Sequence, residues 1–201
     1  MPDVLVPAAR WVRWVDNFAT GHGGVDLAVV AGGLRGQAPD GSHFSARLPF
    51  GASYAGPPEA GAFAAAAVPP GEWGVLLVRK GGFAVARLAA DAVVDSKVGQ
   101  RHVQGRTKAG GQSQQRFARR RDNQARQAYE AAADHAARIL GGVAVLVAGG
   151  DRAAVDAVLA DPRLARAEVV GPWLPVPDPR RAVLDRAVAD AVAVQVDVVN
   201  A

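Results

Sequence analysis

The sequence predicts a mixed α/β fold that contains one long helix, and three observations lead to this prediction. Short apolar runs bounded by turn residues alternate with amphipathic segments through the second half of the chain. Two of these runs, 73–78 and 83–88, flank Lys80-Gly81-Gly82, which is the pattern of a β-hairpin. Half of the 201 residues are hydrophobic, which is enough to bury a sizeable core without disulfides or metal ions.

Residues 1–72 are expected to form an N-terminal helix and hairpin module followed by a linker. Four apolar residues between Trp11 and Phe18 recur at helical spacing, and a glycine-rich turn follows them. The runs 25–30 and 42–48 are typical of strands. Residues 50–74 are rich in Ala, Gly and Pro, so we expect a loop there.

Residues 73–201 are expected to form a second domain, in which the hairpin is extended by a third strand. Ser113 is a plausible N-cap for a long helix that ends before the glycine pair at 141–142. The elements expected after the hairpin are a strand at 95–104, a polar loop at 105–111, the long helix at 113–140, strands at 143–148 and 168–170, helices at 151–159 and 178–192, and a closing edge strand at 194–198. This order, βββ-α-β-α-β-α, predicts a meander followed by right-handed crossover units.

Basic residues are concentrated in one segment of the chain. Residues 97–126 carry nine Lys and Arg and a single acid, Asp122, although the whole chain has a net charge of only +4. The remainder is therefore acidic, and this asymmetry indicates a local contact with a polyanion. Arginine outnumbers lysine in the segment, which favours bidentate recognition of phosphate groups. The alternative is a solvated helix face.

No pattern in the sequence predicts a metal ion or another cofactor. The absence of cysteine excludes thiol catalysis and Cys-ligated zinc, and it fits a reducing cytosol. The four histidines, at positions 22, 43, 102 and 135, are too far apart for a local metal motif. No compelling cluster of carboxylates is present to hold two metal ions. The run Ala148-Gly149-Gly150-Asp151 favours a strand-to-helix turn with an Asp cap, because it lacks both nucleotide-binding fingerprints.

The N-terminal residues lack the pattern of a signal peptide, and no uncharged apolar run approaches the roughly 20 residues that cross a bilayer. We therefore expect a cytoplasmic protein that makes no contact with a membrane. Trp11 and Trp14 are expected to belong to a packing face and not to a base-stacking platform.

The tripeptide Gly110-Gly111-Gln112 is weak by itself, because several Gly-Gly pairs occur in the chain. It stands, however, within the string Gly-Arg-Thr-Lys-Ala-Gly-Gly-Gln-Ser-Gln-Gln-Arg-Phe-Ala-Arg-Arg-Arg, residues 105–121. This string resembles the middle domain of archaeal and eukaryotic class-I peptide-chain release factors. In that family a GGQ loop runs directly into a helix that begins Ser-x-x-Arg-Phe-Ala-Arg. The positions that match are Gly110, Gly111, Gln112, Ser113, Arg116, Phe117, Ala118 and Arg119.

The resemblance implies a ribonuclease-H-like sheet for residues 73–201 and a catalytic role for that domain. Residues 1–72 match no stop-codon-reading domain, and the chain leaves no room for the partner-binding domain of a full release factor. A stand-alone GGQ domain looks like the Vms-like release factors, and particularly like their bacterial branch. Those proteins are peptidyl-tRNA hydrolases of ribosome quality control. The segment 105–108 differs from the usual release-factor sequence.

The family's chemistry implies that Gln112, Gly111 and Gly110 are the catalytic residues, which release nascent chains from stalled ribosomes or large subunits. The basic residues expected to grip RNA are Arg106, Lys108, Arg116, Arg119, Arg120 and Arg121. The expected partners are peptidyl-tRNA and the rRNA of the peptidyl-transferase centre, and the protein is expected to be a monomer without cofactors. Two alternatives stay open: a nuclease that removes the tRNA acceptor end, and a non-enzymatic factor that binds the ribosome.

Overall fold

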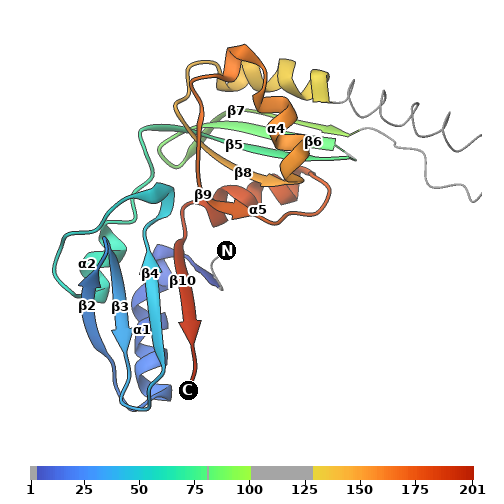
Figure 1. Ribbon diagram of the computed structural model, residues 1–201. Coiled ribbons are helices and arrows are strands. Elements are labelled where there is room, and N and C mark those ends of the chain that lie inside the picture. The colour runs from blue at the N-terminus through green and yellow to red at the C-terminus, as the bar shows by residue number, and fades with distance from the viewer. Residues whose placement is uncertain (1–3, 81, 101–128) are drawn as a thin grey trace, which may run out of the picture. The chain divides into compact units, whose positions relative to one another are not determined.

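The computed structural model describes residues 4–80, 82–100 and 129–201 (Figure 1). The chain divides into two compact units. The first unit comprises Met1–Gly71, Val170–Trp173 and Arg186–Ala201, and the second comprises Glu72–Val169 and Leu174–Asp185. The described strands form two five-stranded sheets, which together with the helices confirm the mixed α/β class.

The first sheet has the order β1-β10-β4-β3-β2, and its neighbouring strands pair antiparallel. Its strands are β1 (Val4–Val6), β2 (Asp26–Val30), β3 (Gly33–Gln37), β4 (His43–Arg47) and β10 (Val194–Val199).

The helices α1 (Ala8–Gly21) and α2 (Ala60–Ala65) pack on one face of this sheet (Figure 1). A short 3-10 turn, Pro49–Gly51, follows β4.

Aromatic side chains fill the space between α1, α2 and the first sheet. Trp11 is fully buried, and its ring centroid lies 5.6 Å from those of Phe44 and Phe63. Trp14 stacks on Trp11 with a centroid distance of 5.3 Å, and Phe18 continues the stack. The expectation that the two tryptophans form a packing face is therefore confirmed.

The second sheet has the order β7-β6-β5-β8-β9. Its strands are β5 (Glu72–Arg79), β6 (Gly82–Ala89), β7 (Ala92–Gln100), β8 (Val145–Gly150) and β9 (Glu168–Leu174). The first three form an antiparallel meander, and β8 runs parallel to β5. The helical elements are residues 129–140, α4 (Arg152–Leu159), the 3-10 turn Pro162–Leu164 and α5 (Arg181–Ala191). The predicted meander is confirmed, and the wider likeness to a ribonuclease-H-like sheet stays a prediction.

Two sequence predictions about local structure are wrong, and one strand was missed. The segment 50–74 is not entirely loop, because α2 forms where Phe63 is fully buried against the first core. Strand β3 was not predicted, since its sequence Gly-Leu-Arg-Gly-Gln contains little that favours a strand. The strand at 194–198 does not close the second sheet: β10 lies between β1 and β4 of the first sheet.

The described part of the chain contains no helix that is both long enough and apolar enough to span a membrane. The predicted boundaries of the later helices shift slightly. The helix expected from Asp178 begins at Arg181, and Asp151 stands at the N-cap of α4 without a capping hydrogen bond from its side chain.

Candidate functional site

The residues predicted to carry catalysis and RNA binding lie outside the described residues. They are Gly110, Gly111 and Gln112 with Arg106, Lys108, Arg116, Arg119, Arg120 and Arg121. His102 and the predicted N-cap Ser113 also lie outside the described part. The geometry that can be described belongs to the two ends of this segment, both of which are in the second unit.

On the N-terminal side the segment follows β7, and on the C-terminal side it leads into the helical residues 129–140. Strand β7 pairs with β6 from Ala89↔Ala92 to Gly82↔Gln100. Lys97 is the one Lys or Arg of the segment 97–126 that the structure describes, and it is exposed on β7 opposite Val85. The positions of β7 and of the helix at 129–140 relative to each other therefore depend on contacts between this helix and the meander.

One aromatic ring contacts both ends. Phe83 on β6 pairs with Gly99 on β7, and its ring occupies the space where a side chain at Gly99 would lie. On the helix, the His135 ring stacks on Phe83 with a centroid distance of 5.4 Å and an interplanar angle of 25°. Phe83 is nearly buried. Its ring therefore joins the end of β7, which precedes the segment 101–128, to the helix at 129–140, which follows it.

Two ion pairs hold the exposed side of the same helix. Arg138 Nη1 lies 2.9 Å from Asp95 Oδ2 on β7. Arg163, in the 3-10 turn Pro162–Leu164, places Nη2 2.6 Å from Asp134 Oδ1 and 2.6 Å from Asp161 Oδ2. Hydrogen bonds from the Arg163 side chain and backbone N–H lower the pKa of Asp161 to about 2. These pairs are exposed, so each contributes little to the stability of the fold.

The buried side of the helix is made of small and aliphatic residues. Ala132, Ala136, Ile139 and Leu140 are all at most 2% exposed and form one apolar stripe along the described part of the helix. Gly74 on β5 allows the close approach, because a Cβ there would lie 2.5 Å from Leu140 Cδ2. The helix is consequently packed tightly on the sheet along this stripe.

The turn from β8 into α4 lies near Tyr129, at the start of the described helix. The backbone N–H of Asp151 donates to the Val78 carbonyl at 2.8 Å, and Gly150 adopts φ +97° at the turn into α4. Burial raises the pKa of the Tyr129 hydroxyl, and the Asp151 carboxylate raises it further. The predicted strand-to-helix turn is thus present, with backbone contacts in place of the Asp cap.

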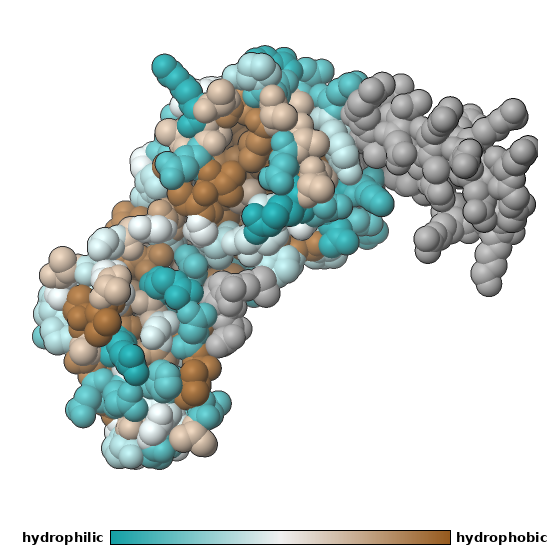
Figure 2. Space-filling view, viewed as in Figure 1, coloured by the Kyte–Doolittle hydropathy of each residue, from teal (hydrophilic) through white to brown (hydrophobic). Residues whose placement is uncertain are grey.

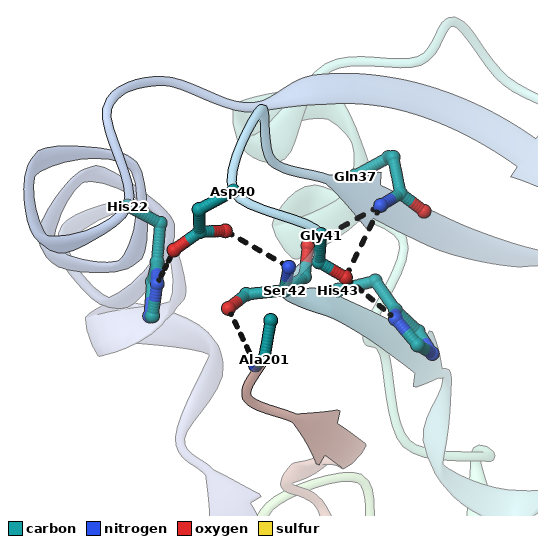
Figure 3. Close-up of polar contacts among 7 residues, drawn as sticks. All are labelled: His22, Gln37, Asp40, Gly41, Ser42, His43 and Ala201. Carbon is teal, nitrogen blue, oxygen red and sulfur yellow. Dashed lines mark hydrogen bonds and ion pairs between the residues drawn. The ribbon is translucent and has the colours of Figure 1, made fainter.

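No group of three or more His, Asp or Glu residues that could hold a metal ion occurs in residues 4–80, 82–100 and 129–201. The described histidines have local partners instead. His22 Nδ1 lies 2.7 Å from Asp40 Oδ2 in the first unit, and the Ser42 N–H donates to the same carboxyl group at 2.8 Å (Figure 3). The hydrogen bond with His22 lowers the pKa of Asp40, and the bond from Ser42 adds to this effect. His43 contacts the Gly41 carbonyl at 3.4 Å.

Sequence reasoning did not find the residues that hold the two ends of the segment. Phe83, Gly99 and His135 are far apart in the chain, and only the strand register and helix position bring them together. A signal was present in part: an aromatic residue on one strand and a glycine on the next are typical of a ring lying over a neighbouring backbone. The pairing register that selects Gly99 was not predictable from the hairpin alone.

Comparison with known proteins bears on the same region. The sequence profile of the Actinobacteria/chloroflexi VLRF1 release factors matches residues 71–197, which include the whole of 105–121. No curated protein matches the chain. Among solved structures, a protein described as "Vms1 mitochondrial localization core" is similar over 91% of this chain and 80% of its own, with 11% sequence identity and a TM-score of 0.44. Because the profile covers more than half of the residues, the chain belongs to the Actinobacteria/chloroflexi branch of the Vms-like (VLRF1) release factors.

Proposed function

We propose that this protein is a peptidyl-tRNA hydrolase that releases nascent chains from stalled ribosomes or large subunits. The observation that carries the proposal is the family match over residues 71–197, within which Gly110-Gly111-Gln112 stands directly before an arginine-rich sequence. In this proposal, one copy of the chain binds one large subunit in the cytoplasm and acts in ribosome rescue.

The reaction is hydrolysis of the ester between the peptide and the terminal ribose of tRNA. Water attacks the ester carbonyl carbon, the bond to the ribose oxygen breaks, and that oxygen takes up a proton. The products are a peptide with a free carboxyl group and an intact tRNA. A nuclease would instead yield a shortened tRNA that still carries the peptide.

The residue types suit this reaction. Glycine at 110 and 111 leaves no side chain to obstruct a narrow RNA site and permits backbone angles with positive φ. The N–H of Gln112 can donate to the oxyanion that develops on the carbonyl oxygen, and one such donor is typically worth about 3–4 kcal/mol. The neutral Gln112 side chain orients water without titrating. The ribose hydroxyl of the tRNA and the rRNA supply the remaining chemistry.

The basic residues have a separate role in this proposal. Arg116, Arg119, Arg120 and Arg121, with Arg106 and Lys108, bind rRNA or tRNA phosphates and set the position of the tripeptide. The second unit supports such positioning, since β7 and the helix at 129–140 are joined by the Phe83 stack and by the Asp95–Arg138 ion pair. A catalyst that has no acid or base of its own depends on the position of its groups, so a rigid support is required.

The test uses purified large subunits that carry a stalled nascent chain on tRNA. The wild-type chain should release the peptide and leave intact, deacylated tRNA. Gln112→Ala should abolish release while binding to the subunit persists, and Gln114→Ala serves as a matched control that keeps release. Undiminished release by Gln112→Ala refutes the hydrolase assignment. A shortened tRNA identifies a nuclease, and binding without any product identifies a non-enzymatic factor.

A further inference from the structure

Strand β2 is the last strand of the first sheet, and no other described strand pairs with its outer edge (Figure 1). Its pairing with β3 is regular over five residue pairs, from Asp26↔Gln37 to Val30↔Gly33. Ala28 is exposed, and Val29 and Val30 are 36% and 51% exposed. Figure 2 shows hydrophobic surface over this strand. An exposed, regular and apolar edge is a site where another strand can pair.

The other three edge strands carry features that prevent such pairing. Strand β1 has only three residues. Strand β7 is interrupted by a bulge between Arg87 and Leu88 of its neighbour. Strand β9 contains Pro172, which has no N–H to donate. Strand β2 has no proline, no bulge and no lysine or arginine, so it alone among the edges of the two described sheets keeps its capacity to pair.

The register identifies the main-chain groups that are available. A two-residue turn, Ala31-Gly32, joins β2 to β3, which makes Val30 and Gly33 a hydrogen-bonded pair. Bonded and non-bonded pairs alternate along an antiparallel ladder, so Leu27 and Val29 direct their N–H and C=O groups away from β3. In the part of the chain that the structure describes, these four groups have no hydrogen-bond partner.

We propose that β2 pairs antiparallel with β2 of a second copy of the chain, with Ala28 opposite Ala28 at the two-fold axis. Leu27 then faces Val29 of the second copy, and all four open main-chain groups form hydrogen bonds. The two alanines form the close, non-bonded pair, whose Cα atoms approach to about 4.5 Å and which small side chains accommodate. Asp26 faces Val30 and not another carboxylate, so no like charges oppose each other.

A second copy fits this edge because β2 is complementary to itself in this register. The same strand provides two open residues around a small central one, with its single charge at one end and an apolar residue at the other. The contact is short. Stable interfaces bury about 1,200–2,000 Å² in total, which one five-residue edge does not reach. The dimer is therefore weak and dependent on concentration, and the expected monomer predominates when the chain is dilute. It is independent of the proposed function.

The experiment is sedimentation equilibrium of the full chain at concentrations from on the order of 10 μM to 1 mM, the range of weak association. The average mass of the wild type should rise from 20.7 kDa towards twice that value. Ala28→Lys and Ala28→Glu each place like charges in contact at the axis and should abolish the rise. An equal mixture of the two variants should restore it, because lysine then faces glutamate. Val94→Lys, on the exposed β7 edge, is the control and should associate like the wild type.

Circular dichroism checks that the variants fold. Both Ala28 variants should fold, because the Ala28 side chain is exposed. A second variant, Val29→Pro, removes one outward N–H and keeps the ladder with β3, so it should also weaken association. The proposal is overturned if the wild type keeps the monomer mass at all concentrations. It is equally overturned if Ala28→Lys associates as the wild type does, or if the mixture of the Lys and Glu variants stays monomeric.

Discussion

A single methyl group added at Gly99 should destabilise the second unit, because the Phe83 ring already occupies its place. A Cβ on Gly99 would lie 2.3 Å from Phe83 Cε1 and 2.6 Å from Cζ, whereas ordinary contact begins at 3.4 Å. The ring would have to move by about 1 Å, and its stack with His135 restricts that movement. Overpacking of this kind costs about 1–3 kcal/mol. For a chain of this size, the expected decrease in Tm is about 2–12 °C.

Differential scanning calorimetry of Gly99→Ala measures this loss, with Gly71→Ala as the matched control. At Gly71 no atom lies within 4 Å of an added Cβ, so that variant should melt like the wild type. The decisive comparison is a double-mutant cycle with Phe83→Leu. Leucine lacks Cε1 and Cζ, so the alanine at 99 should cost less than about 0.5 kcal/mol in that background.

Equal costs of Gly99→Ala in the two backgrounds would refute the reasoning, because they would show that the ring does not fill the space above Gly99. An unchanged Tm in the single variant would refute it as well. The outcome also bears on the proposed function, since the same ring joins β7 to the helix that follows the predicted catalytic segment.

Three further predictions concern charge, helix stability and RNA binding. Arg163→Gln should raise the pKa of Asp161 from about 2 towards its ordinary 3.8, as measured by NMR titration of the carboxyl carbon. Because the folded pKa is the lower one, this interaction stabilises the fold above pH 3.8 and is lost as the pH falls through about 2, so an unchanged titration would contradict the contact. Gly61→Ala, in α2 with open space around its Cβ, should stabilise the first unit by about 0.5–1 kcal/mol in thermal denaturation, and a lower Tm would count against the helix. Arg119→Glu combined with Arg120→Glu should weaken binding to the large subunit and reduce the slope of log K against log salt by about 1.5. Wild-type binding by this folded double variant would show that these arginines do not contact RNA.

Patterns within a few residues determined much of what the sequence predicted. The spacing of Trp11, Val15 and Phe18 predicted α1, because helical periodicity places them on one face wherever the helix packs. The apolar runs around Lys80 predicted the β5–β6 hairpin, whose pairing is local. Family membership also follows from sequence alone, through the profile match over residues 71–197. The roles of Gly110, Gly111 and Gln112 stay predictions.

Tertiary structure alone decided the contacts between distant segments. Val194–Val199 alternates like any edge strand, and nothing within it indicates that it enters the first sheet beside β4, whose residues come about 150 positions earlier. The weak sequence of β3 becomes a strand because β2 and β4 pair with it on both sides. Phe83, Gly99 and His135 meet only after β6, β7 and the helix have docked. The physical reason is that the free energy of such contacts comes from burial and pairing between segments, which no local window of the sequence contains.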